Sequence, residues 1–143
     1  RARNGMKDEL KLYCDTNKLA DLRVFLIEIL QNTTLSEIEQ HQVTLAVDEV
    51  CANLIIHSHG CNGEEFIQVG VEIGDGLLKI EIRDSGEGFN ITEYREPEIT
   101  HVKKAKRKGG LGIILVKKIM DKIEFVSSGK QNTCRLFKNL KSK

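Results

Sequence analysis

The sequence predicts a two-layer α+β sandwich, with helices packed on one face of a mixed, mainly antiparallel sheet. Several short segments alternate polar and apolar residues, as strands do, and three longer segments carry apolar residues at helical spacing. Their order is strand, helix, helix, strand, strand, long loop, helix, strand, strand. With 143 residues, the chain is long enough for one hydrophobic core and short for two.

The first half of the chain predicts one strand and two helices. Residues 9–13 alternate polar and apolar side chains, which is typical of a short strand. Residues 18–30 place leucine, isoleucine and phenylalanine along one helical face. Ser36 followed by Glu39 has the spacing of a capping box, so a second helix should begin there and run to about Ser58.

The second half predicts four strands around one helix. Segments 65–73 and 77–83 alternate in polarity, and the Gly74-Asp75-Gly76 sequence between them is typical of a hairpin turn. From 84 to 108 the chain loses periodicity, which indicates a long surface loop, and loops of this length are usually functional. The remaining predicted elements are a helix over 111–122 and strands over 123–127 and 133–140.

Composition is that of an ordinary globular protein, with 40% hydrophobic and 30% charged residues. The 22 basic and 21 acidic residues nearly cancel, so charge gives no argument for nucleic-acid binding. We find no apolar stretch of about 20 residues and no signal-peptide pattern, so we expect a cytoplasmic protein without a membrane partner. Residues 1–5, ahead of Met6, are expected to be a cloning remnant, and 6–143 a single domain.

The four cysteines are scattered without a CxxC pair, so reduced thiols are expected instead of a disulfide framework. His57, His59 and Cys61 lie close together in the sequence, but no second ligand pair matches them. A zinc site there is not expected.

Glu49, Asn53 and His57 form a polar row at four-residue spacing in a mostly apolar helical segment. That spacing stacks three side chains on one helix face. Two interpretations are open: a solvated stripe, or buried polar groups whose cost is offset by a ligand. The second predicts that Glu49 and Asn53 are poorly hydrogen-bonded in the protein alone.

Two glycine-containing motifs flank the long loop. Asp84-Ser85-Gly86-Glu87-Gly88 begins where a buried strand ends, so it is either an ordinary turn or a place where backbone approaches a ligand. Gly109-Gly110-Leu111-Gly112 opens a helix, so it is either a hinge or a helix N-terminus suited to a phosphate. Neither motif fits a P-loop or a dinucleotide fingerprint.

Together these three motifs resemble the N, G1 and G2 boxes of the GHKL ATPase superfamily, and the whole chain from Met6 resembles its anti-sigma-factor serine kinases. The resemblance implies the Bergerat ATP-binding fold, ATP and Mg²⁺ as cofactors, and a homodimer. It also implies two kinds of partner, an anti-anti-sigma protein with a STAS domain as substrate and a sigma factor. Arg23 is a candidate for partner contact by the same resemblance.

The resemblance also assigns roles. Glu49 would be the general base, Asn53 the Mg²⁺ ligand and Asp84 the acceptor for the adenine amino group, while Thr133 would support the adenine site. His57 is expected to be structural. An ATP lid would cover about 89–108, and its basic residues either contact phosphates or are simply solvated. The residues expected to close around the nucleotide are Gly86, Gly88, Lys108, Gly109, Gly110, Leu111 and Gly112.

Two functions follow from these roles. The first is an ATP-dependent serine kinase that phosphorylates the anti-anti-sigma partner. The second is a nucleotide-binding module that sequesters a partner without turnover, although a pure binder has no need of Glu49. A detached histidine-kinase domain is not expected, because His41, the only histidine upstream of the row, lies on the helix that carries the row.

Overall fold

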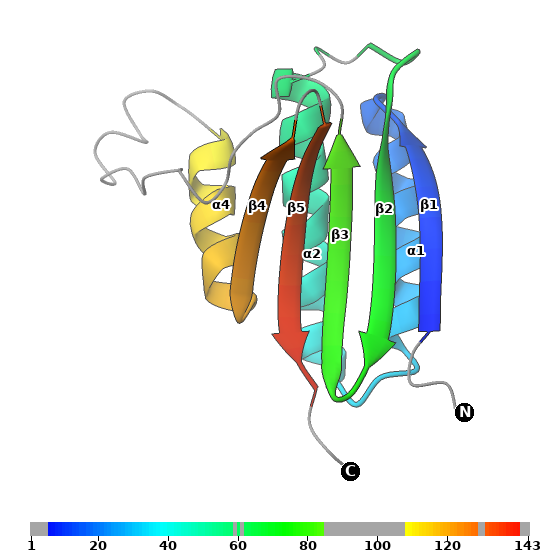
Figure 1. Cartoon of the computed structure of the whole chain (residues 1–143), viewed down its shortest axis with the longest axis vertical. Coiled ribbons are helices and arrows are strands. Elements are labelled where there is room, and N and C mark those ends of the chain that lie inside the picture. The colour runs from blue at the N-terminus through cyan, green and yellow to red at the C-terminus, as the bar shows by residue number, and fades with distance from the viewer. Residues whose placement is uncertain (1–5, 59, 61, 85–107, 129–130, 141–143) are drawn as a thin grey trace.

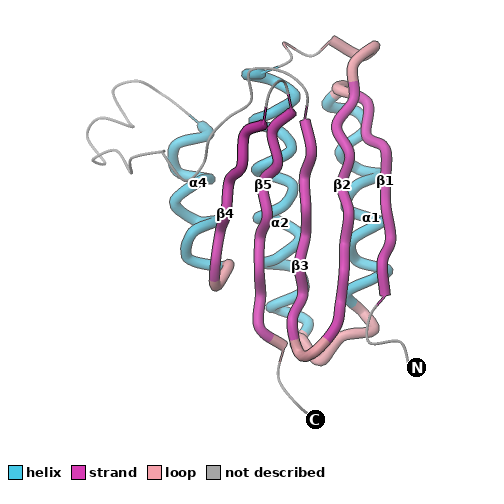
Figure 2. The backbone as a smooth tube through the Cα atoms, in the orientation of Figure 1, coloured by secondary structure: helices cyan, strands magenta, loops and turns pink. Residues whose placement is uncertain are grey.

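The computed structural model describes residues 6–58, 60, 62–84, 108–128 and 131–140, which form two layers. One layer is a five-stranded sheet, and the other consists of helices on a single face of that sheet (Figure 1 and Figure 2). The predicted α+β sandwich is confirmed. The helices are α1 (Leu19–Leu30), α2 (Glu37–Asn53) and α4 (Lys108–Ile119).

The sheet has the strand order β1-β2-β3-β5-β4, and each pairing between neighbouring strands in the described chain is antiparallel. After β3 the chain forms α4, enters the sheet again at its edge as β4, and turns back to place β5 beside β3. The strands are β1 (Met6–Tyr13), β2 (Phe66–Gly74), β3 (Leu77–Asp84), β4 (Lys122–Ser128) and β5 (Gln131–Asn139).

The second helix begins with the predicted capping box. The Ser36 hydroxyl accepts a hydrogen bond from the Glu39 N–H at 3.1 Å, and the Glu39 carboxylate accepts one from the Ser36 N–H at 3.0 Å. These bonds satisfy two backbone donors that a helix N-terminus otherwise leaves open. The helix continues into a single π-helical segment, η2 (Leu54–Ser58), so the helical stretch ends at Ser58 as expected.

A tight hairpin joins β2 and β3, as the glycine-containing sequence predicted. Asp75 and Gly76 both have positive φ, 55° and 73°, which is the backbone that a two-residue hairpin turn of the right twist requires. The turn sets the register in which Gly74 pairs with Leu77. It therefore fixes which side chains of β3 face the helices.

The core lies between the sheet and the helices. Leu78, Ile80 and Ile82 on β3 are at most 1% exposed, and they alternate with charged residues that point to the opposite face. Leu22, Leu26 and other buried residues of α1 complete the core from the helix side, together with Val43, Val47 and Val50 of α2.

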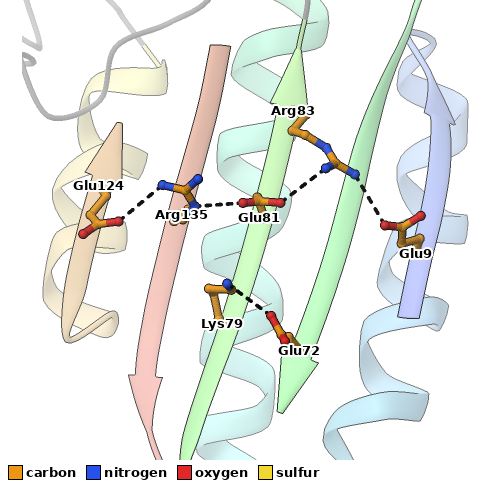
Figure 3. Close-up of polar contacts among 7 residues, drawn as sticks. All are labelled: Glu9, Glu72, Lys79, Glu81, Arg83, Glu124 and Arg135. Atoms are coloured by element: carbon orange, nitrogen blue, oxygen red, sulfur yellow. Dashed lines mark hydrogen bonds and ion pairs between the residues drawn. The ribbon is translucent and has the colours of Figure 1, made fainter. Parts of the chain in front are cut away.

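The face of the sheet away from the helices carries a charged network that crosses the strands (Figure 3). Arg135 donates to Glu81 at 2.8 Å and approaches Glu124 at 3.5 Å. Arg83 reaches Glu81 at 3.5 Å on its own strand and Glu9 on β1 at 3.4 Å, across β2. Charged ladders of this kind suit a solvated sheet face.

Two predicted boundaries were wrong by three residues. The first strand begins at Met6 instead of residue 9, because Met6 to Asp8 pair through their backbone with β2 although their side chains do not alternate clearly. The last helix spans Lys108–Ile119 instead of 111–122. It ends early because the Asp121 N–H donates to the Phe137 carbonyl at 2.8 Å, which draws the following residues into the sheet.

Cys14, Cys51 and Cys134 are buried. Burial raises the pKa of the Cys134 thiol to about 12. Among the described residues, no group of three or more histidine, cysteine or acidic side chains could hold a metal ion, and His59 and Cys61 lie outside that set. None of the described helices is long and apolar enough to cross a membrane.

Candidate functional site

Four element ends come together at one end of the molecule, the upper end in Figure 1. They are the C-terminal ends of α2 and β3 and the N-terminal ends of α4 and β5. Helices α2 and α4 also pack against each other. The sequence motifs are spread over more than 80 positions, yet the fold brings their described residues to this one end.

Glu49 and Asn53 form a hydrogen-bonded pair in the last turns of α2. The Asn53 amide nitrogen donates to the Glu49 carbonyl at 2.9 Å and to its carboxylate at 3.4 Å. Asn53 is 5% exposed and Glu49 is half-buried. The expectation that this row is poorly hydrogen-bonded was wrong for the Asn53 amide nitrogen, because four-residue spacing lets the two side chains satisfy each other.

The pair leaves each side chain with one chemical task. Since the Asn53 nitrogen is directed to Glu49, its carbonyl oxygen is the atom that a hard cation would use. Burial raises the pKa of Glu49, the hydrogen bond from Asn53 lowers it, and the charge of Asp48 raises it, with a net increase. A carboxylate with a raised pKa is closer to the range in which it can act as a general base.

Asp48 is in turn held by Arg23. The Arg23 guanidinium donates to the Asp48 carboxylate at 2.9 Å, which ties α1 to α2 one residue from Glu49. The Arg23 side chain still has 48% of its surface exposed. It is therefore paired within the chain and also accessible, and its expected role in partner contact stays a prediction.

His57 lies in η2, the π-helical segment that follows α2. Its side chain lies outside the part of the chain that the structure describes, so its expected structural role stays a prediction.

Asp84 is the last residue of β3 and is 3% exposed. Its side chain has an interaction partner, although its Oδ2 atom accepts no hydrogen bond from the described residues. A carboxylate buried at a strand end is costly unless donors reach it, so its position suits a ligand that carries an amino group. Gly86, Gly88 and the expected lid up to residue 107 lie outside the described residues.

The structure does not bring Thr133 to Asp84. Thr133 pairs with Arg83, and both belong to the face of the sheet that carries the charged network. Asn132 instead pairs with Asp84 on the helix-facing side and is 6% exposed. Side chains alternate along a strand, so an assignment displaced by one residue moves the side chain to the other face. Asn132, and not Thr133, therefore lies beside Asp84 on the helix-facing side of the sheet.

The glycine-rich motif lies within the first turns of α4, which begins at Lys108. The first four N–H groups of an α-helix have no intrahelical acceptor, and here they belong to Lys108, Gly109, Gly110 and Leu111. Those groups and the positive end of the helix dipole suit an anion, as expected. Gly112 follows them in the helix.

These groups fit a nucleoside triphosphate with Mg²⁺. Asp84 supplies an acceptor for a base, the Asn53 carbonyl oxygen is a hard ligand, and the N-terminus of α4 supplies donors for phosphate. The profile of the histidine kinase-like ATPase domain matches residues 14–138, which include all four of the element ends at this site.

The chain belongs to the histidine kinase-like ATPase domain family. The resemblance identified from the three sequence boxes is thereby confirmed, and an ATPase domain implies that the chain binds ATP. Mg²⁺ binding and the roles of individual residues stay predictions.

Relatives of this ATPase domain include the anti-sigma F factors of Bacillus cytotoxicus and Bacillus cereus. Each is 28% identical to this chain over 127 residues, which cover 88% of this chain and 85% of the relative. The similarity extends over nearly the full length of both proteins and agrees with the anti-sigma-factor resemblance.

Two solved structures share the fold. The RsbU and RsbW domains of a Mycobacterium tuberculosis protein superpose with a TM-score of 0.66 at 14% identity, over 94% of this chain and 32% of that one. The Acinetobacter baumannii histidine kinase AdeS gives a TM-score of 0.53 at 14% identity, over 94% of this chain and 68% of that one. At this identity the similarity shows the fold alone.

Proposed function

We propose that this ATPase domain is an anti-sigma-factor-type serine kinase. It transfers the γ-phosphate of ATP to a serine hydroxyl of an anti-anti-sigma partner with a STAS domain, and thereby regulates a sigma factor in the cytoplasm. Support comes from the relatives named anti-sigma F factor, which align over 88% of the chain. The activity of those relatives is extended to this chain as part of the proposal.

The observation that carries the kinase proposal is the Glu49–Asn53 pair. Glu49 accepts the proton of the attacking serine hydroxyl as that oxygen bonds to the γ-phosphorus and ADP leaves. Its partial burial and raised pKa suit that role. A protein that only binds nucleotide has no use for a carboxylate hydrogen-bonded to a metal ligand.

The other residues hold the nucleotide in place. Asp84 accepts a hydrogen bond from the base, and the backbone N–H groups at the start of α4 donate to phosphates. Asn53 would hold Mg²⁺ through its side-chain carbonyl oxygen, and the ion would supply charge neutralisation for the phosphates. Two further contacts are predicted from the sequence: the backbone at Gly86 and Gly88 closes around the nucleotide, and basic residues of the lid contact phosphates.

The test is phosphoryl transfer in vitro. The full chain is incubated with Mg²⁺ and ATP labelled at the γ-phosphate, together with candidate single-domain STAS proteins, and phosphoserine is mapped by mass spectrometry. Glu49→Gln should bind ATP with unchanged affinity and lose transfer. Glu28→Gln on the exposed side of α1 is the matched control and should retain transfer.

Each outcome has a distinct meaning. Equal transfer by wild type and Glu49→Gln contradicts the base assignment. ATP binding by the wild type without transfer to any STAS candidate supports the alternative, a nucleotide-binding module that sequesters its partner. Absence of Mg²⁺-dependent ATP binding by calorimetry contradicts both.

Homodimerisation is a separate proposal from the family resemblance. Light scattering with size-exclusion chromatography should give twice the mass of 16.1 kDa at micromolar concentration. A monomer at every concentration and with ATP present contradicts it.

A further inference from the structure

A polar row crosses three strands at the end of the otherwise apolar face that packs against the helices. Asp84 on β3 pairs with Asn132 on β5, and Asn132 pairs with Ser127 on β4. Asp84 and Asn132 are 3% and 6% exposed, and they are two of the four buried polar residues in the described chain. Directly paired residues on one sheet face are neighbours in space.

The amide of Asn132 has a defined orientation. The Ser127 hydroxyl donates to the Asn132 side-chain oxygen at 2.9 Å, so the carbonyl end of the amide is directed to β4. The other end is a nitrogen with two donors, which can serve more than one acceptor. Asn132 therefore offers donors on the strand next to the Asp84 carboxylate, which is an acceptor.

An acceptor beside a donor matches one edge of adenine. Its N6 amino group is a donor, and the neighbouring ring nitrogen N1 is an acceptor. We propose that Asn132 donates a hydrogen bond to adenine N1 while Asp84 accepts one from the amino group, and that Ser127 is a positioning residue that orients the amide. This inference rests on the proposed ATP site and concerns how the base is recognised.

Thr133 provides the matched control. It is the next residue on the same strand, but it pairs with Arg83 on the opposite face of the sheet. Its removal should leave base recognition unchanged. The comparison therefore separates a contact with the base from a general effect of altering the start of β5.

The experiment measures the affinity of the full chain for Mg²⁺-ATP and for 1-deaza-ATP, in which a C–H group replaces N1. Wild type should bind ATP about fivefold to tenfold more tightly than the analogue, the worth of one hydrogen bond. Asn132→Ala should bind both nucleotides equally. Ser127→Ala should reduce the ratio of the two affinities, and Thr133→Ala should keep the wild-type ratio.

The two affinities also separate this inference from the proposed function. If the wild type binds ATP without preference over 1-deaza-ATP, the role of Asn132 is overturned and the ATP site is not. This comparison uses the wild-type protein alone, so it does not depend on whether a variant folds. A wild-type ratio in Asn132→Ala overturns it as well. Failure of the wild type to bind either nucleotide overturns the proposed function and this inference together.

Discussion

The buried thiol of Cys134 makes the stability of the sheet core depend on pH in the alkaline range. It lies on β5, two residues beyond Asn132 on the same face, and is 4% exposed. Burial raises the pKa of its thiol from 9.0 to about 12. The thiol ionises first in the unfolded chain, so its contribution to stability is complete below pH 9 and is lost as the pH rises toward 12.

The free energy of unfolding should therefore fall above pH 9, with Cys134 contributing a slope of up to about 1.4 kcal/mol per pH unit. Urea denaturation at several pH values between 8 and 11 measures it. Cys134→Ala is destabilised at every pH by its lost packing, but its slope should be smaller. Identical slopes in the two proteins would show that the buried thiol does not titrate in this way.

At the residue scale, the sequence predicted the relative positions of side chains well where both side chains belong to one helix or strand. Glu49 and Asn53 share one helix, and their spacing predicted that the two side chains share one face of it, although the hydrogen bond between them was not expected. Thr133 depended on pairing between distant strands, which local pattern does not reveal. Burial of Asn132 beside Asp84 is a consequence of strand register.

At the scale of elements, the capping box of α2 controls a helix that carries two site residues. Ser36→Ala removes the side-chain acceptor for the Glu39 N–H and should lower the free energy of unfolding by about 1 kcal/mol. Ser36→Asp retains an acceptor and should retain most of that stability. Chemical denaturation of the three proteins measures the difference, and equal losses in both variants would contradict a capping role.

The charged network gives a second prediction about elements, the coupling of β3 to β5. Burial raises the pKa of Glu81, but the hydrogen bond and charge of Arg135, with the charges of Arg83 and Lys79, lower it overall. A double-mutant cycle with Glu81→Gln and Arg135→Met should give a coupling of about 0.5–1 kcal/mol at neutral pH. It should vanish as the pH falls through the lowered pKa.

The control for this cycle is the Lys122–Glu124 pair on the edge strand. Its side chains are 64% and 38% exposed and 3.2 Å apart, so its coupling should be close to zero. Equal coupling energies in the two pairs would show that burial and cross-strand geometry do not matter here.

Element boundaries show what local patterns leave out. Periodicity identified the described helices and strands, because each pattern reflects a repeat of the backbone itself. The end of α4 was misplaced because a hydrogen bond from Asp121 to β5 ends it, and that partner lies 16 positions later. Backbone pairing with distant strands is a tertiary effect that overrides local propensity.

At the scale of the whole molecule, the fold places its site where four elements end. Nucleotide bound there would contact both layers of the sandwich, so the free energy of binding would add to the free energy of unfolding of the entire domain. This follows from the positions of α2, β3, α4 and β5 at one end (Figure 1). The sequence predicted the two layers, with helices on one face of a mainly antiparallel sheet. It did not predict the strand order β1-β2-β3-β5-β4, which depends on long-range pairing, and the meeting of these ends was expected only from the family resemblance.

Saturating Mg²⁺-ATP should therefore raise the thermal midpoint of the wild-type chain. At 100 times the dissociation constant the gain is about 2.7 kcal/mol, which is on the order of 10 °C for a domain of this size. Asp84→Asn keeps the shape of the side chain but replaces one acceptor oxygen by a donor, so the shift should be largely lost. Glu49→Gln should retain it, because Glu49 acts on the protein substrate in this mechanism and not on the nucleotide. A full shift in Asp84→Asn, measured by calorimetry, would show that the base is not recognised at the end of β3.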